Sequence, residues 1–275
     1  IYDFLSEYAE KNKIRLHMPG HHGKSFDNKL SKLFPLDITE INGADSLFDA
    51  YGIIKESEDN ASALFNTEKT LYSVQGSTLC IQTMLALMKA EKRNVIAVRN
   101  VHRSFINACI LLDLNVTWIY PEYDKSFLSG DIPVHDIEKA LADSDSSCCL
   151  YVTSPDYLGK MCDIKTLSAI CRKYNAALLV DNAHGSHTAF FNPSIHPIAL
   201  GADMCCDSAH KTLPAMTGGA YLHIGNKRYE EHSKQFMSMF ASTSPSYLIM
   251  ASLDLCNKYI SEKIHEDIER CLRNI

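Results

Sequence analysis

The sequence predicts an α/β fold, a three-layer sandwich built on a mostly parallel, seven-stranded sheet. From Glu56 onward, short apolar runs alternate with amphipathic helical segments, which is the pattern of strands covered by helices on both faces. Of the 275 residues, 46% are hydrophobic and 22% are charged, which is the usage of a globular protein that can bury a large core. This composition excludes disordered, collagen-like and fibrous classes.

The elements are expected in the following order. An amphipathic helix over about residues 2–11 precedes an irregular stretch, 17–51, and a connection of that length is usually functional. Strands are expected at 70–74, 95–98, 116–119, 148–152, 177–180, 204–207 and 220–224. Helices are expected at 79–90, 104–112, 134–142, 164–174 and 195–200, and then at 226–240 and 246–270. We expect an N-terminal segment, 1–55, and one large domain, 56–275.

Charge and cysteine usage narrow the class of protein. The formal net charge of −6 disfavours nucleic acid and membrane surfaces as partners. Ten cysteines lie in apolar stretches, so we interpret them as buried hydrophobic residues of a reduced, cytoplasmic protein rather than as disulfides or a metal site. No apolar run is long enough to span a bilayer, and the start has no signal-peptide pattern. A first residue other than Met suggests a trimmed chain.

Three predicted strands end in unusual residues. Ligands of an open parallel sheet bind beyond the carboxyl ends of its strands, so the residues after each apolar run are the first candidates. One strand runs into Asp181-Asn182-Ala183-His184 and another into Asp207-Ser208-Ala209-His210-Lys211-Thr212. A third runs into Gly76-Ser77-Thr78 at the start of a helix, where free backbone N–H groups favour an anion. Ordinary helix capping is the alternative for this last motif, which lacks the spacing of a nucleotide-binding P-loop.

Together these residues offer what pyridoxal 5′-phosphate (PLP) requires. Lys211 follows a strand that should be buried, where desolvation would lower the pKa of its amine and favour a Schiff base. Asp181 is an acid that can keep a pyridine nitrogen protonated, and Gly76-Ser77-Thr78 is a candidate phosphate cup. His102 also follows an apolar strand and is placed to lie against a cofactor ring. An exposed lysine, a capping aspartate and a hydrogen-bonded histidine are the alternatives for the separate residues.

From about Arg15 to Asp254, the sequence resembles the bacterial PLP-dependent ornithine/lysine/arginine decarboxylases of the aspartate aminotransferase fold type, fold type I. No single motif decides this resemblance, but the order and spacing of the motifs are specific. The motifs are His17-Met-Pro-Gly-His-His-Gly, Asp37-Ile-Thr-Glu, Gly76-Ser-Thr, Arg99-Asn-Val-His-Arg-Ser, Asp181-Asn-Ala-His-Gly, Ser208-Ala-His-Lys-Thr-Leu-Pro-Ala and Ser242-Thr-Ser-Pro-Ser-Tyr.

The resemblance implies a role for each candidate residue. Lys211 is expected to bind PLP covalently, Asp181 to pair with the pyridine nitrogen, His102 to stack on the ring, and His184 to lie beside it. The residues expected around the phosphate are Ser77, Thr78, Ser208 and His210. Ser242 is expected to reach the phosphate of a neighbouring subunit, and the loop 17–23 to line the partner's substrate entrance. The resemblance thus implies a homodimer or higher homo-oligomer with shared active sites.

The implied reaction is decarboxylation of a basic amino acid (lysine, arginine or ornithine), a step of polyamine biosynthesis. Two positions depart from the family pattern, Leu79-Cys80-Ile81 after the phosphate turn and Asn182 where many relatives have Glu. The family also continues into a C-terminal domain that is apparently absent after Ile275. The alternatives are therefore another fold type I reaction, such as an aminotransferase or lyase reaction, and a truncated PLP-binding protein without catalysis.

Overall fold

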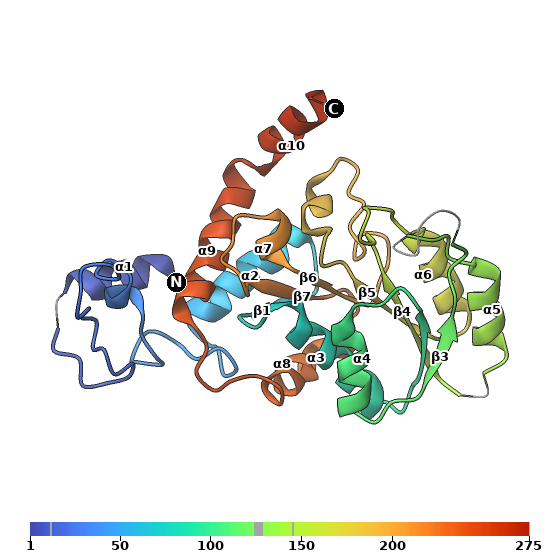
Figure 1. The fold of residues 1–275 in the computed structure, drawn as a ribbon, viewed down its shortest axis with the longest axis horizontal. Helices are drawn as coiled ribbons and strands as arrows, with labels where there is room; N and C mark the ends of the chain where they lie inside the picture. The colour runs from blue at the N-terminus through green and yellow to red at the C-terminus, as the bar shows by residue number, and fades with distance from the viewer. Residues whose placement is uncertain (12, 124–128, 145, 275) are drawn as a thin grey trace.

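The computed structural model describes residues 1–11, 13–123, 129–144 and 146–274. In this part of the chain, seven strands form one sheet in the order β1-β7-β6-β5-β4-β2-β3 (Figure 1). The strands are β1 (Lys69–Ser73), β2 (Asn94–Val98), β3 (Val116–Ile119), β4 (Cys148–Thr153), β5 (Ala177–Asp181), β6 (Met204–Asp207) and β7 (Ala220–Ile224). Only β7 is antiparallel to its neighbours, β1 and β6. The predicted seven-stranded, mostly parallel sheet is confirmed.

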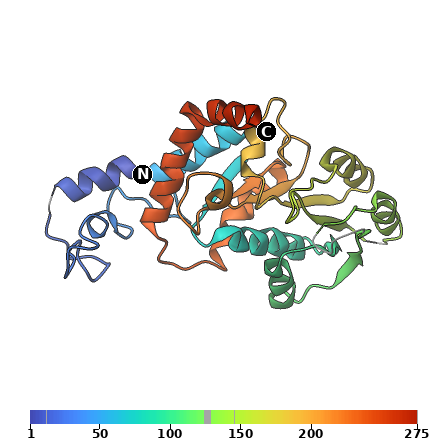
Figure 2. The ribbon, with the colours of Figure 1, turned by 45° about the horizontal axis from the view of Figure 1, so that its top comes forward.

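Helices cover both faces of this sheet (Figures 1 and 2). One face carries α3 (Gly76–Ala90), α4 (Arg103–Leu111) and α8 (Glu230–Ser238). The other carries α2 (Ile53–Phe65) and α9 (Tyr247–Glu262) near β1 and β7, α6 (Ile164–Lys173) near β5, and α5 (Val134–Ala142) near β2 and β3. The shorter or peripheral helices are α1 (Tyr2–Glu10), α7 (Ala209–Thr212), α10 (Ile264–Arg273) and the 3₁₀ turns η1 (Phe34–Leu36), η2 (Ser186–Phe190) and η3 (Lys227–Tyr229).

The apolar runs are buried on both sides because successive side chains of a strand point to opposite faces. In β5, Leu179 packs into the core under α3 and α4, whereas Leu178 packs into the core under α5 and α6. In β6, Cys206 and Cys205 divide in the same way. The cysteines of the described chain are free and mostly buried, as expected for small apolar residues.

Two helix predictions need correction, and one helix was missed. No helix forms at 195–200, where the chain makes only a turn, because Pro197 disfavours the helical conformation of the residue before it, His196. The predicted single helix 246–270 is two helices, since α9 ends at Glu262 and Lys263 has a non-helical φ of −136°. Helix α2 was not predicted, and it ends at Asn66 in the left-handed conformation with φ 52°.

The segment before α2 lies at one end of the molecule in both ribbon views (Figures 1 and 2). Within it, α1 packs against α9 and against η1. Several of its apolar side chains face solvent, including Ile14 (90% exposed), Leu16 (93%) and Phe26 (97%). Among the described residues, no helix has both the length and the apolar character needed to cross a membrane.

Candidate active site

The candidate residues lie at one edge of the sheet, at or just beyond the carboxyl ends of the parallel strands. The carboxyl ends of β1, β2, β4, β5 and β6 lie at this edge because these strands all run in the same direction. A cavity of about 600 Å³ opens there. The predicted site residues that line it are Ser77, His102, Asp181, His184 and Lys211. Five positions that are spread over more than 130 residues of sequence, from Ser77 to Lys211, therefore line one cavity.

Asp181 is the buried carboxylate of this cavity, with 2% of its surface exposed. Its side chain accepts the Ala183 backbone N–H at 3.2 Å and the Tyr151 hydroxyl at 3.4 Å. Burial raises the pKa of Asp181, although Ala183, His102 and Lys211 act in the opposite direction. No side-chain cation of the described residues forms an ion pair with it. The cavity therefore offers a place for a ligand cation against this carboxylate.

Lys211 lies in the short helix α7, one turn beyond the end of β6. The side chain lines the cavity and is exposed in the single chain. The expectation of a desolvated amine is therefore wrong for this chain alone, because α7 projects from the sheet edge and leaves the lysine open to solvent. Lys211 and the buried Asp181 line the same cavity.

His184 and His102 border the same cavity. Burial lowers the pKa of His184, and the charge of Lys211 lowers it further, so this imidazole is neutral at neutral pH. His102 caps α4, and its Nδ1 accepts the Ser104 backbone N–H at 3.2 Å. The His102 side chain is exposed and lines the cavity.

Hydroxyl groups gather at the N-terminus of α3. Gly76 begins this helix with φ +68°, a conformation that L side chains rarely adopt. The Ser208 hydroxyl donates to the Ser77 hydroxyl at 3.0 Å, and the Thr78 and Ser104 hydroxyls lie 2.8 Å apart. Free N–H groups of the first helical turn lie beside them, so this corner is suited to an anion such as phosphate.

Two predicted residues lie apart from this arrangement. His210 directs its Nδ1 to the Gly219 carbonyl oxygen at 2.9 Å and does not line the cavity. Ser242 lies exposed between α8 and α9, where its hydroxyl oxygen accepts the Ser244 N–H at 3.1 Å. Neither residue contributes to the cavity walls of this single chain.

The prediction missed two polar residues of the cavity. The side-chain oxygens of Asn100 and Thr153 are buried and have no hydrogen-bond partner in the described chain, and both residues line the cavity. A buried polar atom without a partner is costly, so these two atoms are suited to ligand contacts. Thr153 is the last residue of β4, so the rule that selected Asp181 would also have selected it.

Comparison with known proteins identifies the family. Residues 1–275 match the model of the Orn/Lys/Arg decarboxylase major domain. The protein belongs to this decarboxylase family. Its fold is the predicted fold type I, as in the lysine decarboxylase LdcF of Francisella novicida, with a TM-score of 0.82 and 22% identity over 93% of this chain and 39% of that one.

Two curated relatives of the decarboxylase family are similar along nearly the whole chain. "Uncharacterized protein YaaO" of Bacillus subtilis is 32% identical over 97% of this chain and 57% of its own length. "Arginine decarboxylase" of Bacillus anthracis is 29% identical over 99% of this chain and 57% of its own length. The chain thus spans just over half the length of these two relatives.

Proposed function

We propose that this protein carries the cofactor site of a PLP-dependent decarboxylase that acts on lysine, arginine or ornithine. The observation that carries the proposal is that Lys211 and Asp181 line one cavity, with paired hydroxyls at the N-terminus of α3 on its border. An amine, an unpaired buried acid and an anion site are the three groups that PLP requires. The arginine decarboxylase among its relatives supports a basic amino acid as substrate.

We assign each residue a separate role in binding the cofactor or in the reaction. Lys211 provides the amine that attaches to the cofactor aldehyde, and Asp181 keeps the pyridine nitrogen protonated. The α3 N-terminus, with Ser77, Thr78 and Ser208, holds the phosphate, and His210 joins them only if its ring turns away from the Gly219 carbonyl oxygen. PLP, when bound, supplies a conjugated ring that takes up the electrons left by departing CO₂.

The two histidines orient the reactants. We assign His102 to the face of the cofactor ring and neutral His184 to a hydrogen bond beside it. The orphaned oxygens of Asn100 and Thr153 accept hydrogen bonds from the bound molecules. By fixing the bond to the carboxylate relative to the ring and by excluding water, these side chains favour loss of CO₂.

The decisive experiment combines a spectrum with a product assay on the full-length protein. We expect a visible absorbance band from bound PLP that borohydride bleaches, and CO₂ with the corresponding amine from one of the three basic amino acids. A keto acid as product would instead indicate an aminotransferase. Bound PLP with no turnover of any of the three would identify a binding protein without catalysis.

The proposal also covers the domain organisation, the oligomeric state and the cellular location of the protein. We propose an N-terminal segment, 1–55, and a PLP-binding domain, 56–275, in a homodimer or larger homo-oligomer with shared active sites. Exposed Ser242 and the apolar side chains exposed before α2 support pairing with a second copy. Free, mostly buried cysteines support a cytoplasmic location, and basic amino acids as substrates support a role in polyamine biosynthesis.

Mixing two inactive variants tests the shared site. In a mixed dimer, one copy carries Lys211→Ala and the other carries Ser242→Ala. Because each shared site takes Lys211 from one copy and Ser242 from the other, one site has both defects and the other site is intact. After subunit exchange we expect about a quarter of full activity, since half of randomly re-paired dimers are mixed and each has one intact site. His21→Ala in place of Ser242→Ala tests the loop 17–23. A protein that sediments as a monomer with full PLP occupancy would contradict sharing.

A further inference from the structure

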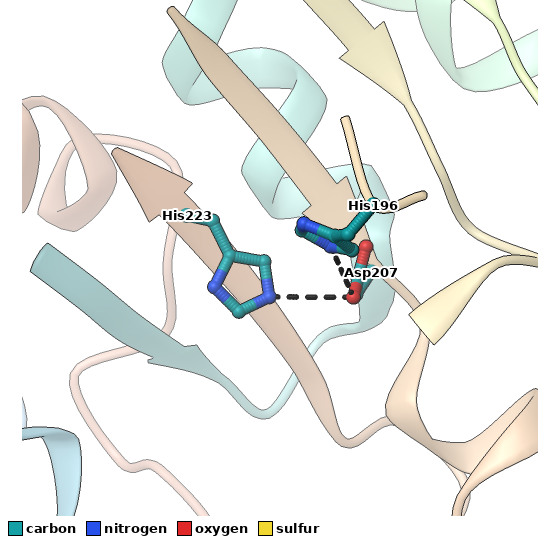
Figure 3. A group of neighbouring side chains, drawn as sticks. All are labelled: His196, Asp207 and His223. Carbon is teal, nitrogen blue, oxygen red and sulfur yellow. Dashed lines mark hydrogen bonds and ion pairs between the residues drawn. The ribbon is translucent and has the colours of Figure 1, made fainter. Parts of the chain in front are cut away.

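A buried polar cluster lies directly behind the candidate active site. Asp207, the last residue of β6, has its Oδ2 atom 3.2 Å from His196 Nε2 and 3.3 Å from His223 Nε2 (Figure 3). The three residues are 0 or 1% exposed. The Phe65 ring closes the cluster at centroid distances of 4.4 Å from His223 and 5.8 Å from His196. Such a costly group of polar side chains in the core requires a reason.

The proton positions favour a hydrogen-bonded cluster over a metal site. The Ile198 backbone N–H donates to His196 Nδ1 at 3.4 Å, so the proton of this neutral imidazole is on Nε2 and points to Asp207. A metal ion would require a lone pair at that same Nε2 atom. His223 Nδ1 contacts the Thr70 hydroxyl at 2.8 Å, and its Nε2 lies off the axis of a good hydrogen bond to Asp207. The His223 contact is therefore mainly electrostatic.

The carboxylate at the centre is ionised. Burial opposes the charge of Asp207, but the two imidazoles outweigh burial and hold its pKa well below the usual range. Burial lowers the pKa of His223 despite the nearby carboxylate. The ionised carboxylate accepts hydrogen bonds from His196 Nε2 and from the Asn182 amide, and hydrogen bonds to a charged acceptor are stronger than those to a neutral one.

This cluster connects to both polar residues that the proposed cofactor requires. The other oxygen of Asp207, Oδ1, accepts the Asn182 amide at 2.6 Å, and Asn182 directly follows Asp181. Asp207 itself directly precedes Ser208, whose carbonyl oxygen accepts the Lys211 backbone N–H at 2.9 Å. The cluster therefore joins the backbone segment that carries Asp181 to the one that carries Lys211.

The connection crosses the sheet. Asp181 pairs with Cys206 across β5 and β6, and the Cys206 thiol lies 3.6 Å from Asp181 Oδ1 on the cavity side. Because side chains alternate along a strand, Asn182 and Asp207 project to the opposite face. They meet there without entering the cavity, where they would compete with a ligand.

We propose that Asp207, held by His196 and His223, is a positioning residue that fixes Asp181 and Lys211 relative to each other from the far face of the sheet. This inference rests on the proposed PLP site. It assigns no contact with cofactor or substrate to the cluster. The cluster acts through Asn182 and through the peptide that leads to Ser208.

The test compares PLP affinity with stability in matched variants of the full-length protein. Asp207→Asn removes the negative charge at the centre of the cluster. Asn182→Ala leaves that charge in place and removes the side-chain hydrogen bond between Asn182 and Asp207, through which the cluster is joined to Asp181. Asn257→Ala is the control, since Asn257 makes buried hydrogen bonds to Ser57 and Tyr72 away from the cavity. For each variant we would measure the PLP dissociation constant from the visible band, the position of that band, and the Tm without PLP.

We expect Asp207→Asn and Asn182→Ala to bind PLP about tenfold more weakly, the effect of losing one hydrogen bond to a charged group, and to shift the band. The control should lower Tm and leave both PLP measurements unchanged. Wild-type PLP affinity in folded Asn182→Ala and Asp207→Asn would overturn the proposal, as would a stoichiometric metal ion in the purified protein. If Asp207→Asn fails to fold, Asn182→Ala decides the question alone. A wild-type protein that binds no PLP would instead refute the proposed function itself.

Discussion

A Lys211→Ala variant is expected to lose covalent PLP attachment completely and decarboxylase activity by at least about 10²–10⁴-fold, the range for one positioned catalytic group. Lys211 lines the cavity with Asp181, and its side chain is exposed. Replacement by Ala therefore removes the reactive amine without leaving a cavity in the core. Helix α7 should form unchanged, because Ala is the strongest helix former.

Borohydride reduction followed by peptide mass mapping measures this effect. In the wild-type protein, the reduced cofactor should be on the peptide that contains Lys211, and the variant should carry none. Lys227→Ala is a suitable control, because Lys227 is exposed in η3 and does not line the cavity. Cofactor fixed on another lysine of the wild-type protein would show that the site is assigned wrongly.

Sequence patterns predicted all seven strands because each is a short run rich in apolar, aromatic or β-branched residues, and all of them except β3 are largely buried. The same patterns failed where a different effect decides the local structure. Pro197 prevents a helix in an apolar segment, and the polar residues of α2 concealed a helix whose buried side comprises Ile54, Ala61 and Phe65. Local periodicity therefore identifies strands here more reliably than it identifies helix ends.

The site residues that follow a strand could be predicted from the sequence, whereas the residues that meet only through long-range contacts could not. Asp181 and His102 were found because each follows a strand, and strand ends meet at one edge of a parallel sheet. The cluster of His196, Asp207 and His223 was not found, because its members meet only through the register of β6 with β7 and the return of a loop. Only pairing across strands, which single-sequence patterns do not encode, brings these residues together.

Asp181→Asn is the second large effect that we expect. The amide keeps the shape of the side chain, and its oxygen can still accept the Ala183 N–H, so PLP should remain attached to Lys211. The charge that keeps the pyridine nitrogen protonated is lost, and turnover should fall by about 10²–10⁴-fold. Steady-state rates and the visible band of the same samples separate loss of turnover from loss of cofactor. Near-normal turnover would exclude the proposed role of Asp181.

The thermal stability of the protein, without and with PLP, provides an independent test of the role of the Asp181 charge. Burial raises the pKa of Asp181 above its ordinary value of 3.8, so the folded protein without PLP binds this proton more tightly than the unfolded chain does. The contribution of Asp181 to the free energy of unfolding is then largest below pH 3.8 and falls as pH rises through the raised pKa. At neutral pH, Asp181→Asn without PLP should therefore melt at the same temperature as wild type or higher. Added PLP should raise its Tm by less than it raises that of wild type, because the ligand cation no longer meets a carboxylate. A lower Tm without PLP, together with an undiminished increment from PLP, would show that Asp181 is a structural residue and not the partner of the cofactor nitrogen.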